Sequence, residues 1–159
     1  RGHTQPRSHI RRNGLSGDLY VYLSNGSESA VLLNRPGRSV SAPDGSGTVG
    51  LNVTLDDNAF ADIHTAIPES GGAFSGTYQS DGRNVDPYNV VSTDLRTATL
   101  ASFFGTNANG TWTLFVADQA AGDTSTLESW SLTITAVPEP SAALLGGLGM
   151  LVLLWRRRP

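Results

Sequence analysis

The chain has 159 residues and no Cys, and all eleven of its basic residues are Arg. Four Arg lie in the first twelve residues and three at the end, so residues 13–155 hold four Arg against fourteen acidic residues, about −10. An acidic body argues against nucleic-acid binding, because phosphates require the opposite charge. The lack of Cys removes disulfides and thiolate metal sites but leaves export open, since disulfides are optional outside the cell.

The first twelve residues are polar and basic and show no apolar period, which predicts a disordered tail. His3 and His9 lie there without an acidic residue nearby, and such loosely placed His make a poor metal site. We therefore expect three parts: a basic tail over residues 1–12, a folded domain over 13–136 and a separate segment over 137–159.

The first half of the domain predicts three short strands. Residues 17–24 alternate strictly and end at Asn25-Gly26, a dipeptide typical of tight hairpin turns, and 29–34 return as the partner strand. After a polar loop, residues 49–55 alternate again and point Leu51, Val53 and Leu55 inward. Residues 59–67 fit either a short strand or a helical turn, and 71–94 are largely irregular.

The second half is dominated by residues 109–135, where two alternating stretches flank a polar turn. Trp112 falls on one face of the first stretch and Trp130 on one face of the second. The pattern predicts an antiparallel hairpin with both Trp rings in the core. Seven or so short strands without a long amphipathic helix predict an all-β sandwich.

The C-terminal segment begins with an extended spacer, Val137-Pro138-Glu139-Pro140, and continues with fifteen uncharged residues, 141–155. A helix of this length spans about 22 Å, less than the ~30 Å hydrocarbon core of a bilayer. A buried core helix is the alternative. However, Trp155 followed by Arg156, Arg157 and Arg158 is typical of an interfacial anchor with a positive-inside stop, so we expect a short transmembrane helix with residues 13–136 outside.

This segment resembles a PEP-CTERM sorting signal. The parts that match are Pro138, Glu139 and Pro140, the short apolar helix, and the terminal Arg cluster. The resemblance implies a bacterial exported protein, handled by an exosortase that recognises and cleaves near the Pro-Glu-Pro motif. The product is then passed to the envelope surface or the exopolysaccharide matrix.

The body resembles the P domain, or Homo B domain, of subtilisin-like proprotein convertases. Its matching stretches are residues 17–19, 32–37, 76–78, 109–114, 122–124 and 127–132, together with Asp118. The resemblance implies a jelly-roll-like antiparallel β-sandwich similar to galactose-binding domains. One departure is that residues 7–13, where the family has its first strand, are basic and do not alternate.

No residues of this chain predict catalysis. The family's protease domain carries its Ser in a Gly-Thr-Ser-Met-Ala motif, which this sequence lacks, and no Gly-x-Ser-x-Gly elbow occurs. His64 is the only His of the body, and nothing in its spacing supplies the Ser and carboxylate that a triad needs. We interpret it as a surface or packing residue.

Acidic residues crowd two loops and make candidate Ca²⁺ ligands, since Ca²⁺ takes hard oxygen donors from loops. The candidates are Asp56, Asp57, Asp62, Asp81 and Asp86. The alternative is a set of solvated turn carboxylates, because the stretch from Asp81 to Asp86 lacks the ligand spacing of an EF-hand.

Three functions follow as hypotheses. The first is a non-catalytic exported module that binds protein or polysaccharide in the envelope or matrix. The second is an accessory domain of a subtilisin-like protease whose catalytic domain is absent from this chain. The third is a calcium-dependent carbohydrate-binding module, which rests on analogy between folds.

Overall fold

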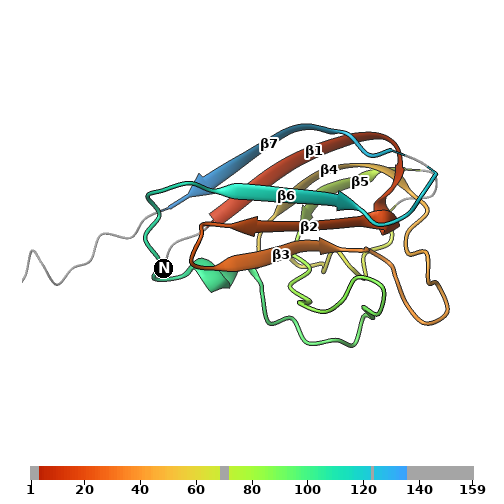
Figure 1. The fold of residues 1–159 in the computed structure, drawn as a ribbon, viewed down its shortest axis with the longest axis horizontal. Coiled ribbons are helices and arrows are strands. Elements are labelled where there is room, and N and C mark those ends of the chain that lie inside the picture. The colour runs from red at the N-terminus through yellow and green to blue at the C-terminus, as the bar shows by residue number, and fades with distance from the viewer. Residues whose placement is uncertain (1–3, 69–71, 123, 136–159) are drawn as a thin grey trace, which may run out of the picture.

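The computed structural model describes residues 4–68, 72–122 and 124–135, with side chains described from residue 14 onward. The described chain is all-β and forms two sheets. The sheets lie one over the other, with β7, β1, β4 and β5 in one layer and β6, β2 and β3 in the other (Figure 1). The strands run over Thr4–Leu15 (β1), Leu19–Ser24 (β2), Ser29–Asn34 (β3), Val49–Leu55 (β4), Phe74–Tyr78 (β5), Thr113–Asp118 (β6) and Leu127–Ile134 (β7). Two short 3-10 helices, Ser16–Asp18 (η1) and Leu100–Phe103 (η2), complete the described elements.

The three stretches predicted in the first half of the domain form strands. β3 and β4 begin and end at the predicted residues, and β2 is paired with β3 through the turn at Asn25-Gly26. Gly26 has φ +90°, a conformation that favours glycine, and Asn25 Oδ1 accepts hydrogen bonds from the backbone N–H groups of Ser27 and Glu28. Apolar pattern and turn residues together thus located the strands that supply most of the core.

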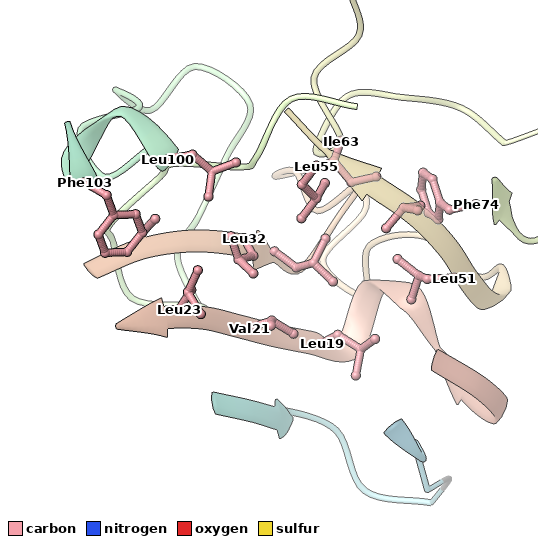
Figure 2. Packing of buried hydrophobic residues seen from close by; sticks show 13 residues of the cluster. Leu19, Val21, Leu23, Leu32, Leu51, Leu55, Ile63, Phe74, Leu100 and Phe103 are labelled. Carbon is pink, nitrogen blue, oxygen red and sulfur yellow. The ribbon is translucent and has the colours of Figure 1, made fainter. Parts of the chain in front are cut away.

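The core lies between the two sheets. Its buried residues come mainly from β2, β3 and β4, and Phe74 of β5 and Phe103 of η2 lie at its opposite ends (Figure 2). The cluster consists of Leu19, Val21, Leu23, Ala30, Leu32, Leu33, Leu51, Val53, Leu55, Ile63, Phe74, Leu100 and Phe103. Each buried Leu or Phe side chain contributes about 1.5–3 kcal/mol by leaving water. This burial holds the two layers together.

The predicted disordered tail is a strand. β1 pairs with β4 along one edge and with β7 along the other, so it is a central strand of its sheet (Figure 1). The prediction was wrong because it relied on side-chain period. A strand between two neighbours is also fixed by backbone hydrogen bonds along both edges, and these require no alternation. The register shifts of β1 against both partners interrupt any strict period further.

The predicted hairpin over residues 109–135 is also wrong. β6 pairs with β2 and β7 pairs with β1, so the two halves lie in different sheets. Trp112 packs against the core, with its ring 4.8 Å from that of Phe103. Trp130 lies on β7, an edge strand, and is 38% exposed, so it is not the core residue we predicted. Alternation identified each strand but carried no information about its partner.

β5 corrects two further predictions. It is a strand inside the stretch predicted to be irregular, and it runs parallel to β4, so this sheet is mixed rather than antiparallel. β5 is short, lies at the sheet edge and contains Gly76 at φ +115°, which explains why its pattern is weak. Residues 59–67 form turns that bury Ile63 and His64.

Candidate functional site

A group of polar side chains lies buried beside β3, and we call it the Asp81 cluster: Asn34, Asp62, His64, Asp81 and Arg83. Asp81 is fully buried and His64 is 1% exposed. Asp81 Oδ2 lies 2.8 Å from Nδ1 of His64 and accepts the backbone N–H of Asn34 at 3.1 Å. The backbone N–H groups of Asp81 and Gly82 donate to carbonyls of β3, so this loop covers the strand's outer edge.

Arg83 joins two carboxylates in the cluster. Its Nη1 lies 3.2 Å from Asp81 Oδ1, and its Nη2 lies 2.8 Å from Asp62 Oδ2. Burial acts to lower the pKa of Arg83, but hydrogen bonds and charge from Asp62 and Asp81 outweigh it, and the pKa is raised. The guanidinium therefore stays charged and offsets part of the negative charge of the two acids, which suits a buried structural network.

His64 has oxygen partners at both ring nitrogens. Nδ1 faces Asp81, and Nε2 lies 3.1 Å from the backbone carbonyl oxygen of Arg38. A general base in a nucleophilic triad needs a nitrogen directed at its Ser hydroxyl. Both nitrogens of His64 are occupied by other oxygens, so its geometry suits packing rather than proton transfer.

The five calcium candidates are spread over separate contacts. Asp62 and Asp81 share Arg83, whose guanidinium fills the place between them that a cation would take. Asp57 accepts hydrogen bonds from Ser80 Oγ and the backbone N–H of Ala101, whereas Asp56 and Asp86 accept backbone N–H groups within turns. Among the described side chains, no three His, Asp or Glu are placed to hold one metal ion.

A second feature, which the sequence analysis did not identify, is an aromatic surface on the outside of the β2–β6 pair. We call the outward side chains Tyr20, Tyr22 and Phe115 the aromatic face. Tyr22 pairs with Phe115 across the strands, and their rings stack with centroids 4.8 Å apart. The ring of Tyr20 lies 6.1 Å from that of Tyr22, and Phe115 is 42% exposed.

The sequence did carry a signal for this face. In residues 19–24 the positions between the buried Leu19, Val21 and Leu23 hold Tyr, where a solvated face ordinarily holds short polar side chains. Leu114, Phe115 and Val116 are also consecutive, so both faces of β6 are apolar. The pairing of β6 with β2, which brings these residues together, is not visible in either stretch alone.

Comparison with family models gives two matches. Residues 74–134 match the proprotein convertase P-domain, and residues 136–158 match the PEP-CTERM protein-sorting motif. The comparisons with curated proteins and with solved structures give no match.

The described part of the molecule is thus an all-β domain with two sheets around one core. The chain carries a proprotein convertase P-domain followed by a PEP-CTERM sorting motif, as both resemblances predicted. The P-domain is a non-catalytic accessory domain, and the family comparison detects no catalytic domain in this chain.

The sorting motif fixes where the protein is delivered. It indicates an exported protein that is anchored through its C-terminus in the cell envelope, and it implies recognition by an exosortase and association with the membrane. Its residues Pro138, Glu139 and Pro140, the predicted span 141–155 and the cluster Arg156, Arg157 and Arg158 lie outside the described residues. Within the described ranges, no helix has the length and hydropathy needed to cross a bilayer.

Proposed function

We propose that this protein is a non-catalytic binding module of the bacterial envelope or exopolysaccharide matrix, delivered by an exosortase and acting through contacts with protein or polysaccharide. The observation that carries this proposal is the PEP-CTERM match directly after a P-domain match, with β7 ending at Ile134 and the sorting motif starting at residue 136. A folded domain joined to a sorting signal suits presentation of a surface outside the cell.

Two features of the domain support a binding role over catalysis. The polar residues of the Asp81 cluster are bonded to one another, and all except the half-buried Asp62 are buried, so they suit stabilisation of the fold rather than contact with a substrate. The aromatic face, in contrast, is partly exposed and rests on rigid strands, as binding surfaces require.

Delivery is tested by replacing the motif. Wild-type protein and the triple variant P138A/E139A/P140A are expressed in a host with an exosortase, and each fraction is probed for the domain. We expect wild type in the outer envelope or matrix fraction and the variant retained with the inner membrane. The same distribution for both proteins would contradict the proposal.

The second candidate function is an accessory role for a subtilisin-like protease encoded separately. It is favoured by the P-domain match itself, since that domain accompanies convertases. Co-purification of such a protease with the tagged full chain, and loss of protease stability when the chain is deleted, would support this role.

Calcium dependence is a further proposal and has its own test. Calorimetry of the full chain with Ca²⁺ alone, and a thermal melt with and without a chelator, measure it directly. A heat of binding with a shifted melting temperature supports a calcium-dependent module, and the absence of both removes it.

A further inference from the structure

We propose that the aromatic face binds an uncharged polysaccharide chain, which deepens the proposed function by giving this surface one class of ligand. The inference rests on that proposed function. It is drawn from three observations: the position of three rings, the absence of charged side chains on the face, and the engagement of the body's described Arg side chains with carboxylates or carbonyl oxygens.

The first argument is the placement of the rings. Tyr20 pairs with Ala117 and Tyr22 with Phe115, and the next pair along is Ser24 with Thr113. Directly paired residues of antiparallel strands point to the same side, so these six side chains form one surface. Among the described residues β6 is the last strand of its sheet, so there the side of Phe115 turned away from Tyr22 has no neighbouring strand.

The second argument is the boundary of the surface. Asn34 and Val31 pair with Tyr20 and Tyr22 from the other strand and point to the same side, yet both are buried. Asn34 is covered because its Nδ2 donates to the backbone carbonyls of Arg83 and Val85. The loop therefore lies over β3 and leaves a strip open along β2 and β6, which fits an extended chain.

Tyr88 marks one end of this strip. Its hydroxyl donates to the carbonyl of Gln119, which follows β6, at 3.3 Å, and its ring is 58% exposed beneath the guanidinium of Arg35. Gln119 lies near the Tyr20 end of the strand pair, because Leu19 pairs with Asp118. A fourth ring thus stands beside the first three.

The third argument is charge. The six outward side chains of the face are aromatic, hydroxyl-bearing or Ala, and none is ionisable in the neutral range. The body is acidic overall. Its four described Arg side chains are all engaged, Arg83 and Arg35 with carboxylates and Arg38 and Arg96 with carbonyl oxygens. An anionic polymer would meet repulsion from the acidic body and would find no unengaged guanidinium among the described side chains, so charge complementarity favours a neutral ligand.

The chemistry of the surface fits sugar rings. A pyranose presents C–H groups on one face, and the negative face of an aromatic ring attracts such positively polarised groups. Tyr adds a hydroxyl that donates or accepts hydrogen bonds with sugar hydroxyls. Rigid Tyr side chains supply contact area at low cost in conformational entropy.

The test is affinity electrophoresis of the full chain in gels that contain one polymer each: mixed-linkage β-glucan, galactomannan, soluble starch or alginate. We expect retardation in at least one neutral polymer and none in alginate. Phe115→Leu, which keeps an apolar side chain, and Tyr22→Ala should weaken retardation by about tenfold. Phe60→Ala removes an equally large but fully exposed ring away from the face and serves as the matched control.

A second measurement uses unmodified protein, so that a folding defect of a variant does not decide the outcome. Tyr nitration is followed by mass spectrometry with and without the neutral polymer, and we expect protection of Tyr20 and Tyr22. Retardation in alginate alone, no retardation in any neutral gel, or equal loss in Phe60→Ala would overturn the inference.

The inference and the proposed function fail differently. To distinguish them, the protein is sedimented with two preparations of isolated matrix. Matrix treated with protease retains its polysaccharide, and matrix treated with glycosidases retains its protein. Loss of binding on protease treatment alone would contradict the polysaccharide inference but not the proposed binding function. Absence of binding to either preparation would contradict both the inference and the proposed function.

Discussion

The Nδ1 atom of His64 lies 2.8 Å from Oδ2 of Asp81, and these two side chains are 1% and 0% exposed. They lie seventeen residues apart, in two stretches whose sequence pattern was ambiguous or predicted irregular structure. The pair ties the loop after β4 to the loop that covers the edge of β3. It is therefore a buried side-chain connection between two loops that are also joined by the β-bridge of Asp62 with Gln79.

The first prediction concerns Asp81. Asp81→Ala removes one buried acceptor from each of His64, Arg83 and the backbone N–H of Asn34, and we expect a loss of about 3–5 kcal/mol in the free energy of unfolding. Asp44→Ala, at an exposed loop carboxylate, should change it by less than about 0.5 kcal/mol. Urea denaturation of the full chain measures both. Equal stability of the two variants would show that the cluster contributes little.

The second prediction concerns Arg83. Arg83→Met leaves Asp62 and Asp81 without the counter-charge between them. We expect a loss of about 3–5 kcal/mol in the free energy of unfolding. The double variant R83M/D62N also removes one of the two repelling carboxylates. It should recover part of the lost stability, since residues in one network are coupled by about 0.5–3 kcal/mol. Denaturation of the four proteins of this cycle gives the coupling directly. Additive losses would contradict the network.

The third prediction uses Tyr20. Burial raises its pKa above the ordinary value near 10, with smaller contributions from Tyr22 and Asp81. Because the folded state holds the phenol proton more tightly, the stabilisation is complete below the ordinary pKa and is lost as pH rises through the raised one. Urea midpoints taken from about pH 9 to about pH 11 should fall less steeply in Tyr20→Phe than in wild type.

The sequence predicted the parts of this fold that depend on local pattern. β4 has the predicted bounds because it alternates without interruption, and β3 because its apolar run from Ala30 to Leu33 lies between turn residues. β1 was missed because pairing with β4 and β7 holds it, and the sequence of β1 does not reveal its partners. The same limit produced the wrong hairpin, since strand partners are chosen across the whole chain.

The candidate site divides in the same way. The acidic residues were found by composition, but their partners Arg83 and His64 were not, because the contacts join loops separated by about twenty residues. The aromatic face needed the β2–β6 pairing, which joins strands some ninety residues apart. Local sequence patterns thus identified candidate residues, and long-range pairing determined which of them are in contact.

The last prediction separates the family match from the folding unit. Residues 74–134 contain β5, β6 and β7, which pair with β4, β2 and β1 respectively and never with one another. Of the thirteen buried residues of the core cluster, only Phe74, Leu100 and Phe103 lie in this segment. A peptide of residues 74–134 would have neither sheet partners nor most of its core, so we expect a disordered circular dichroism spectrum and no cooperative melt. The full chain should melt cooperatively under the same conditions, and adding a peptide of residues 1–73 should restore β-structure to the fragment. A stable β-fold in the isolated fragment would show that these strands can pair differently from the arrangement in Figure 1.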